Sequence, residues 1–428
     1  MRLSGQTIFA LSSGRPPAAI AVVRVSGPLA HLAGEQLGGR LPECRTAAVR
    51  ELRDPGDGTL LDEALVIAFA APATATGEDI VEFHCHGGRA VVDAVLGALS
   101  RIEGLRPAQP GEFTRRAFDH GRIDLTEAEG LADLLEAETE TQRRAALSLS
   151  DGSLKRQIDA WQERLLSLSG MAERAIDHAE EHDEPMPSAF YDDVDTLAAE
   201  LQSWLERPRL EPLKDGIRIV VAGPPNSGKS SLVNAIAGVD RAIVSAIPGT
   251  TRDYIEVPFA INGIPCLLTD TAGLRETVDS VEIIGVERAA RLIVAADILL
   301  WLGPSSEAPS HQRLVQLIPK ADLGLAPTDG SSLAVSSKTG QGLEPLIDRV
   351  AALAAHFIPA ENAVALNRRQ SALIGEAEAA LGPCVKSGDL AVVADGLRSA
   401  RQSFDRITGR AGVEDMLDAL FARFCLGK

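Results

Sequence analysis

The chain has 428 residues, of which 45% are hydrophobic and 24% charged, a composition typical of a globular protein with two to four domains. Its formal net charge of −18 argues against broad, non-specific binding of RNA or DNA, although it is compatible with a local basic patch, for example at 113–122 (FTRRAFDHGR). Without a run of 18 uncharged apolar residues we expect no membrane span. A reduced, cytoplasmic setting is indicated by five scattered cysteines, Cys44, Cys85, Cys266, Cys384 and Cys425.

Four zones follow one another along the chain. Residues 1–120 mix short β-branched runs with Gly/Pro turns and one helical stretch near 89–101, which predicts a small α+β domain. Residues 121–212 and 362–428 have helical patterns, and residues 215–358 alternate strands and helices as in a parallel α/β domain. Because helical zones lie on both sides, we expect one discontinuous helical domain that carries the α/β domain as an insertion.

The first helical zone opens with a predicted helix start. Thr126 and Glu129 have the spacing of a capping box. The helix that follows would place four apolar residues on one face: Ala128, Leu131, Ala132 and Leu135.

The strongest motif is the phosphate loop in residues 217–238 (IRIVVAGPPNSGKSSLVNAIAG). An apolar strand runs into Gly223, and Gly228, Lys229 and Ser230 follow before a helix, in the strand-loop-helix context that G-x-x-x-x-G-K-S requires. The glycines let backbone N–H groups surround a β-phosphate. Lys229 supplies charge to the β/γ-phosphates, and the Ser230 hydroxyl can ligate Mg²⁺. The motif predicts a nucleotide site.

Three companions follow in the order of a small GTPase core. Residues 247–253 (IPGTTRD) offer two threonines, and residues 254–270 read as two strands joined by Asn262-Gly263, a strong hairpin signal. Asp270 then ends an apolar strand at the spacing of a carboxylate near Mg²⁺, and Gly273 would turn an N–H toward the γ-phosphate.

At this point the chain resembles the MnmE (TrmE) family, bacterial tRNA-modifying GTPases whose G domain is inserted in a helical domain. The resemblance covers nearly the full length. It is carried by GEDIVEFHCHGG, PGEFTRRAF, DLTEAEGLADLLEAETE, GPPNSGKSSLVNAIAG, IPGTTRD, DTAGLRET, VERA and the terminal FCLGK.

The resemblance implies a fold and a function. It implies an N-terminal α+β domain (1–120) that forms the homodimer and binds a tetrahydrofolate derivative (5-formyl or 5,10-methylene), and a Ras-like P-loop GTPase domain within the helical domain. It also implies a heterotetramer or larger complex with the FAD-dependent protein MnmG, through which tRNA is bound. Together they would install an aminomethyl or carboxymethylaminomethyl group at C5 of the wobble uridine. GTP hydrolysis would be potassium-dependent and driven by dimerisation of G domains.

Catalytic and metal-binding positions also come from the resemblance. Potassium ligands match Asn226, Ser245, Ile247 and Thr250, and Mg²⁺ ligands match Ser230 and Thr251. A monovalent cation there would neutralise charge developing on the phosphates. Leu274 stands where many GTPases carry a glutamine, so the water-orienting role falls to Glu282. The implied catalytic set is Glu282, Lys229, Thr251 and Gly273.

Binding positions follow in the same way. The implied GTP contacts are Asn226, Ser227, Gly228, Lys229, Ser230, Ser231, Ser245, Ala246, Ile247, Pro248, Gly249, Thr250, Thr251, Asp270, Thr271, Ala272, Gly273, Lys320, Asp322, Ser336, Ser337 and Lys338. The implied folate contacts are Arg24, Glu82, Arg122 and Lys428. Glu82, His84 and His86 would share one strand face, which we interpret as a polar pocket wall rather than a metal site. Cys425 is either a catalytic thiol or, as we favour, a buried structural cysteine.

The guanine-reading loop departs from its usual Asn-Lys-x-Asp form. In LVQLIPKADL (314–323) Pro319 replaces the asparagine, while Lys320 and Asp322 are retained. Asp322 can accept both the ring N–H and the exocyclic amine of guanine, so we expect specificity to survive. Pro319 cannot supply a side-chain amide, so we expect binding weaker by about 1–2 kcal/mol. The segment before this strand also looks short for the family.

Two other functions are weighed against the tRNA-modifying GTPase. A ribosome-assembly GTPase would need a basic RNA-binding appendage, whereas this chain ends in AGVEDMLDALFARFCLGK. A regulatory nucleotide-binding module with a weakened site is kept open by Pro319. Against it stand the retained Lys229, Ser230, Thr251, Asp270 and Glu282.

Overall fold

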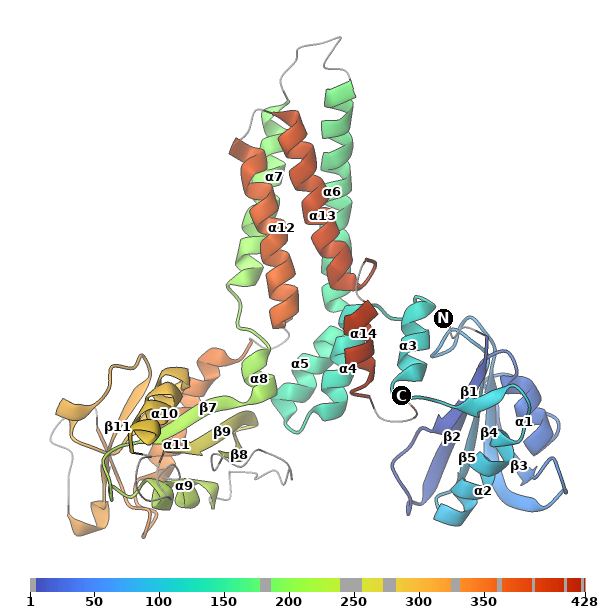
Figure 1. Cartoon of the computed structure of the whole chain (residues 1–428), viewed down its shortest axis with the longest axis horizontal. Helices are drawn as coiled ribbons and strands as arrows, with labels where there is room; N and C mark the ends of the chain where they lie inside the picture. Colours follow the sequence, from blue (N-terminus) through green and yellow to red (C-terminus); the bar gives the residue numbers. More distant parts are fainter. Residues whose placement is uncertain are drawn as a thin grey trace. The chain divides into compact units, whose positions relative to one another are not determined.

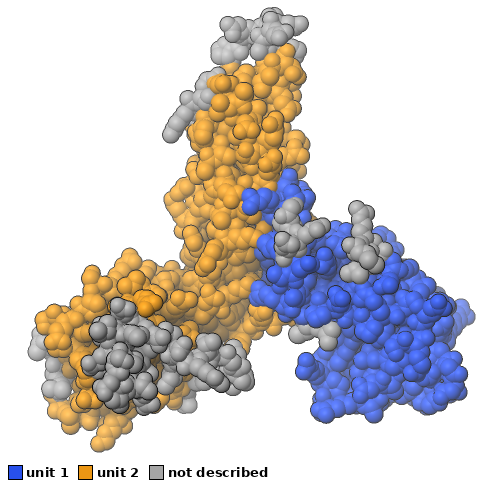
Figure 2. All heavy atoms as spheres, viewed as in Figure 1, with its two compact units in different colours: residues 1–132, 405–428 blue, residues 133–404 orange. Residues whose placement is uncertain are grey.

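The computed structural model forms two compact units, which Figure 2 colours separately: residues 1–132 with 405–428, and residues 133–404. Only the backbone is described for 282–288, 385–386 and 414–415. The described residues are 5–177, 186–238, 256–271, 282–324, 332–359, 364–386, 389–411, 414–424 and 427.

The first unit is built on a six-stranded sheet with the order β3-β4-β5-β2-β1-β6, in which only the β1–β6 pair is parallel among the described strands. The core on this sheet includes Phe83, Leu99 and Leu37. The elements are β1 (Thr7–Leu11), β2 (Ile20–Ser26), α1 (Ala30–Gly38), β3 (Ala47–Arg53), β4 (Leu60–Phe69), β5 (Ile80–His86), α2 (Arg89–Ser100), β6 (Leu105–Pro107) and α3 (Glu112–Asp119).

The C-terminal segment returns to this unit. α4 (Leu125–Glu136) packs the buried Leu125, Ala128 and Ala132 against Leu417 and Phe421 of α14 (Glu414–Phe421). Leu135, expected on the same face, is instead exposed.

The capping box of α4 differs from the sequence prediction. Asp124 Oδ1 accepts from the Glu127 amide at 2.9 Å, and Glu127 Oε2 accepts from the Asp124 amide at 2.8 Å. The predicted pair of Thr126 and Glu129 is therefore wrong by two residues. Thr126 is fully buried, and its hydroxyl donates to the Asp124 carboxylate. It therefore helps to position Asp124, which is the N-cap residue.

The second unit contains a helical bundle made from both helical zones. α6 (Ser153–Asp177) and α7 (Ser188–Leu205) precede the α/β region, while α12 (Arg368–Lys386) and α13 (Leu390–Thr408) follow it; the four run side by side in Figure 1. The fully buried Trp161 of α6 stacks on Phe404 of α13 at 5.5 Å and meets Trp204 of α7 edge-on at 5.2 Å between ring centroids. This shared core confirms a discontinuous helical domain.

The described strands of the α/β region form a six-stranded sheet with the order β12-β11-β10-β7-β9-β8, and among these strands only β8 is antiparallel to its neighbour. Asn262 and Gly263 have φ of 51° and 79°, so the predicted β8–β9 turn is confirmed. The elements are α8 (Glu211–Asp215), β7 (Ile217–Ala222), α9 (Lys229–Ala237), β8 (Glu256–Ile261), β9 (Ile264–Asp270), α10 (Glu282–Ala295), β10 (Ile298–Trp301), η2 (Ser305–Glu307), β11 (Leu314–Pro319), η3 (Ala321–Leu323), β12 (Leu333–Val335), α11 (Leu343–Ala354) and η4 (Ala355–Phe357).

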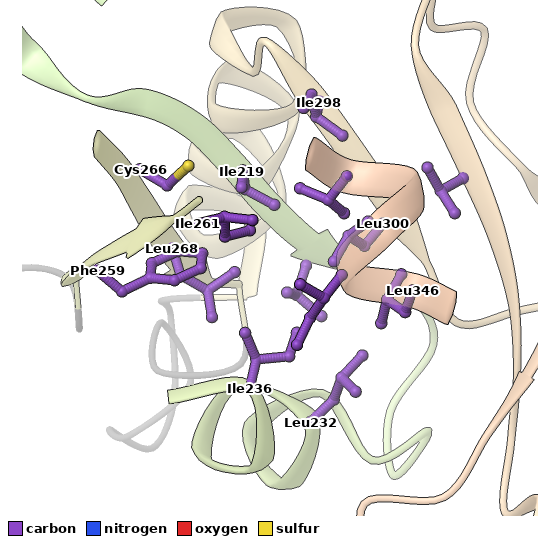
Figure 3. Packing of buried hydrophobic residues seen from close by; sticks show 14 of the residues in the cluster. Ile219, Leu232, Ile236, Phe259, Ile261, Cys266, Leu268, Ile298, Leu300 and Leu346 are labelled. Carbon is purple, nitrogen blue, oxygen red and sulfur yellow. The ribbon is translucent and has the colours of Figure 1, made fainter. Parts of the chain in front are cut away.

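The main core of this region lies between the sheet and the helices α9 and α11. Leu232 and Ile236 of α9 meet Ile219, Leu268 and Leu300 of the strands, as Figure 3 shows, and Leu346 of α11 joins the same cluster. A smaller cluster around Leu299 packs against α10 on the other face.

The connection between the parallel strands β10 and β11 contains little secondary structure. Residues 302–313 are all described, and they form only the short helix η2 where such crossovers usually carry an α-helix. The start of this loop is hydrogen-bonded to the strands that it connects. Trp301 Nε1 of β10 donates to the Pro304 carbonyl, and Gln316 Nε2 of β11 donates to the Gly303 carbonyl. Among the described residues, no helix is long and apolar enough to cross a membrane.

The bundle core predicts a stability effect that joins both helical zones. In a Trp301→Phe background, where Trp161 and Trp204 report on the bundle, Phe404→Ala should lower the free energy of unfolding by about 3–5 kcal/mol because it leaves a cavity among aromatic rings. Urea titration followed by fluorescence measures the change. The matched control is Leu166→Ala, which removes a 58% exposed side chain of α6. Equal midpoints for the two variants would contradict a common core.

Candidate nucleotide site

The predicted nucleotide-binding elements meet at one edge of the parallel sheet. The loops that follow β7, β9, β11 and β12 all leave the carboxyl ends of parallel strands, which is where open α/β sheets bind ligands. Residues far apart in the sequence are thus brought to one place by the strand order alone.

The phosphate loop joins β7 to α9. Gly223 has φ of 151°, and a Cβ there would lie 2.8 Å from the Leu302 carbonyl oxygen. Gly228, the residue directly before α9, has φ of 94° and lies in the left-handed region. Asn226 also lies in this region, with φ of 59°. These conformations turn successive amides toward the mouth of the loop, at the positive end of a helix dipole.

Lys229 lies within this loop. Its side chain is buried, and Nζ donates to the carbonyls of Gly223 at 3.1 Å and Pro224 at 2.8 Å. The ammonium group is therefore held across the loop opening, where a polyphosphate would meet it.

Ser230, one of the two expected Mg²⁺ ligands, lies beside Asp270, the carboxylate expected near the ion. Ser230 Oγ donates to Asp270 Oδ2 at 2.5 Å, and Asp270 is 3% exposed at the end of β9. Thr271, the next residue, is fastened to the Val221 carbonyl through its hydroxyl at 3.0 Å. A hydroxyl beside a carboxylate is the hard-oxygen donor set that Mg²⁺ prefers, so these residues fit the ion.

Ser227 supports the same interpretation. Its hydroxyl is buried, and it has no hydrogen-bond partner among the described residues. A buried hydroxyl without a partner costs about 1–3 kcal/mol, which a ligand oxygen in the loop would relieve.

The base-reading residues occupy the ends of β11 and β12. Ser336, which is 1% exposed, donates through Oγ to Asp322 Oδ1 at 2.7 Å and accepts from the amides of Lys338 and Thr339 at 3.3 Å. Asp322 itself is exposed, so its second oxygen is available to a base. Lys320 has φ of 62° and turns the chain out of β11 after Pro319.

Part of the predicted site lies outside the described residues. These positions are Ser245, Ala246, Ile247, Pro248, Gly249, Thr250, Thr251, Ala272, Gly273, Cys425 and Lys428. Glu282 is the first residue of α10, where only the backbone is described. Their roles stay predictions.

The candidate folate residues are only partly brought together. Arg24 and Glu82 face each other across β2 and β5 and form an ion pair of 2.8 Å, with His84 Nε2 3.4 Å from the same carboxylate. Arg122 hydrogen-bonds elsewhere, to the Thr74 carbonyl at 3.1 Å. His86 pairs with Asp62. In the described part of the chain no cluster of His, Cys, Asp or Glu is arranged to hold a metal ion.

The described cysteines offer no reactive thiolate in a site. Burial raises the pKa of the Cys85 and Cys266 thiols to about 12, and burial also raises the pKa of Cys384. Cys44 is exposed. Since the thiolate is the reactive form, the three buried cysteines have a packing role.

Sequence reasoning missed the residues that support the phosphate loop from the next strand. The Leu302 amide donates to the Ala222 carbonyl at 2.8 Å, and Gly303 approaches Pro224 so closely that a Cβ would lie 2.7 Å from its Cδ. The only local signal is a glycine directly after a buried strand, a pattern that is common elsewhere.

Comparison with known proteins agrees with this geometry. Family models match over most of the chain: "MnmE helical domain" at residues 125–425 and "GTP-binding protein TrmE N-terminus" at residues 7–122. Among solved structures, the G domain of the T. maritima FeoB iron transporter is 24% identical over 32% of this chain and 98% of that chain. Its TM-score of 0.23 adds nothing to the sequence relationship.

Curated relatives match over the full length. A tRNA modification GTPase MnmE from Erythrobacter litoralis is 52% identical over 99% of this chain and all of its own, and one from Zymomonas mobilis is 49% identical with the same coverage. A third, from Rhizorhabdus wittichii, is 51% identical over 99% of this chain and 97% of its own. The chain therefore belongs to the MnmE family of tRNA modification GTPases.

Proposed function

We propose that this GTPase hydrolyses GTP in a potassium-dependent reaction and, in the cytoplasm, works with an FAD-dependent MnmG-type partner on tRNA. Together they would install the aminomethyl or carboxymethylaminomethyl group at C5 of the wobble uridine. The observation that supports this most strongly is the meeting of Lys229, Ser230, Asp270 and Asp322 at one edge of the sheet. The proposed assembly contains a homodimer formed by the N-terminal domain.

The chain's own groups would act by position and charge. Lys229 would exchange its two loop carbonyls for phosphate oxygens, while the loop amides donate to the same phosphates. Ser230 and Asp270 would hold Mg²⁺, with Thr251 as a further ligand. Asn226 is exposed at the loop tip and would contribute to a potassium site with Ser245, Ile247 and Thr250. A bound cation there would neutralise negative charge that develops on the phosphates.

Hydrolysis also needs an oriented water molecule. Leu274 has no group that could hold one, and Glu282 is the carboxylate that the family resemblance offers for this role. The helix α10, which begins at Glu282, packs its later residues Leu292 and Ile293 against the sheet. The position of its first turn is thereby linked to the same β-sheet as the phosphate loop.

Guanine recognition would depend on Asp322. Ser336 occupies one carboxylate oxygen and fixes the side chain, which leaves the charge and the second oxygen for the guanine N1–H and 2-amino groups. Adenine lacks that donor pair, so the aspartate would be left unpaired against it.

For the N-terminal domain we propose a tetrahydrofolate derivative as the one-carbon donor. The partly exposed Arg24 and Glu82 pair offers both a cation and a carboxylate, which suit the acidic tail and the pterin donors of a folate. Arg122 and Lys428 remain proposed contacts. A ribosome-assembly role is less well supported, since relatives about half identical over the full length bear the tRNA-modification name.

The potassium proposal predicts a selective defect for Asn226→Ala. The ratio of GTP hydrolysis rates in potassium and sodium buffers should fall at least about tenfold, because one ligand of the cation is lost. The affinity for GTP should change little, since the loop amides remain. The control Asn234→Ala alters an exposed position of α9. An unchanged potassium-to-sodium ratio in Asn226→Ala would remove this residue from the cation site.

Asp322→Asn should change the base that is accepted. An amide in place of the carboxylate loses the charge-assisted pair to guanine, at a cost of about 1.5–3 kcal/mol, but can donate to the 2-carbonyl of xanthine. Competition binding with GTP and xanthosine triphosphate measures the change in relative affinity for the two bases. The exposed Glu344→Gln of α11 serves as a control of equal charge change. Retained preference for GTP would contradict base reading by Asp322.

Pro319→Asn should strengthen GTP binding by about 1–2 kcal/mol, or about 5- to 30-fold, because it restores a side-chain amide beside the base. Isothermal titration of GDP into both proteins measures the gain. No gain would mean that the loop after β11 holds the base in a different way.

A further inference from the structure

A cleft of about 380 Å³ lies where the chain passes from the helical bundle into the G domain and back. The incoming segment and the outgoing segment are fastened together here, because the Leu210 amide donates to the Leu366 carbonyl at 3.0 Å. α8 and the first residues of α12 occupy this junction (Figure 1). The cleft is lined by Arg207, Pro208, Arg209, Glu211, Pro212, His356, Phe357 and Arg368.

The lining is basic in a strongly acidic protein. Arg209 and Arg368 are both exposed, and in the part of the chain that the structure describes neither guanidinium has an ion-pair partner. The guanidinium carbon of Arg207 lies over the Trp204 ring, 3.8 Å from its centroid, so the position of this arginine is set by packing. The three arginines exceed the single carboxylate of Glu211 in the cleft.

Glu211 is engaged in holding the cleft together. Its Oε1 accepts from the backbone amide of Arg368, which joins α8 to the start of α12. Its Oε2 is buried and has no hydrogen-bond partner among the described residues. The carboxylate thus ties α8 to the start of α12, and with three arginines against one carboxylate in the lining a positive excess remains for an anion.

Guanidinium groups, an aromatic ring and open access together favour a nucleic-acid backbone. Arginine forks match phosphate oxygens in a bidentate way. Phe357 lines the cleft half-buried, and Arg313 stacks on its ring at 4.4 Å. Aromatic rings next to basic groups are the usual surface for unpaired bases and their phosphates. The volume suits one or two nucleotides, not a helical groove.

The basic stretch noted in the sequence is not available for the same task. Arg116 is 5% exposed and pairs with Glu78 at 2.8 Å, and Arg115 pairs with Asp418 at 2.5 Å. With a net charge of −18, the chain as a whole repels a polyanion, so RNA contact requires a local cluster whose charges are not already paired.

We propose that the cleft between Arg209 and Arg368 binds the phosphodiester backbone of tRNA, in an unpaired stretch. This assignment rests on the proposed function in tRNA modification, and it gives this chain a direct contact with the RNA. Because Arg209 precedes β7 and Arg368 follows η4, a phosphate held by both arginines would connect the two chain crossings of the G domain.

The test is binding of unfractionated, fluorescently labelled tRNA to the full-length protein, followed by anisotropy at 50 to 200 mM potassium chloride. The double variant Arg209→Gln/Arg368→Gln should bind about tenfold more weakly at the low salt. Its plot of log affinity against log salt should be shallower by about two units, one for each lost phosphate contact. Arg209→Lys/Arg368→Lys should keep the salt dependence, because the charges are kept, but should bind more weakly than the unmodified protein, because lysine lacks the bidentate fork.

The matched control is Arg398→Gln/Arg401→Gln, two exposed arginines of α13 with the same change in net charge. Equal loss in this control, or no tRNA binding by the unmodified protein at 50 mM salt, would overturn the proposal. Tight, cleft-dependent binding of poly-glutamate in place of tRNA would also overturn it, in favour of an acidic protein partner.

GTP hydrolysis is measured in parallel. If the unmodified protein does not hydrolyse GTP, the proposed function is refuted. If the double variant hydrolyses GTP normally but no longer binds tRNA, the cleft proposal is supported independently of the GTPase activity.

Discussion

The stacking of Trp161 on Phe404 requires helices from both ends of the α/β region to share one core. The G domain leaves the bundle after α7 and rejoins it at α12, and because these two helices pack along each other, both crossings lie at the same end of the bundle. The hydrogen bond between Leu210 and Leu366 then joins the two crossings directly.

The nucleotide edge shows how a GTPase site tolerates the loss of an expected side chain. Asp322 keeps its orientation through Ser336, which is itself buried and hydrogen-bonded to two backbone amides. The bracing of the phosphate loop comes from the loop after β10, where Leu302 and Gly303 approach Ala222 and Pro224. Pro319 therefore removes a contact to the base without removing the support on either side of it. Specificity and affinity become separable properties of the site.

Features determined by local patterns could be predicted from the sequence. The phosphate loop and the Asn262-Gly263 turn depend on glycine conformations within a few residues, and both were found as expected. The alternation of buried and exposed residues along β5 follows in the same way. The start of α4 was misplaced because the burial of Thr126, which depends on tertiary packing, decided which side chain caps the helix.

Other features depend on contacts that no local pattern reveals. The support of Gly223 by Leu302 and the basic cleft around Arg209 and Arg368 both join segments that are distant in the sequence. A spacing rule has no access to such pairs. The identities of Asn226 and Glu282 as candidate site residues came from family resemblance, since an exposed asparagine or a glutamate at the start of a helix carries no chemical signal alone.

We expect this G domain to select guanine through Asp322 although it lacks the guanine-reading asparagine. The most direct test is phosphate release from GTP and from ATP by the unaltered full-length protein in one potassium buffer. We expect kcat/KM for GTP to exceed that for ATP by at least about 100-fold, since adenine would leave Asp322 without its donors. Comparable values for the two nucleotides would contradict this account and would mean that Pro319 marks a change in the base that the domain accepts.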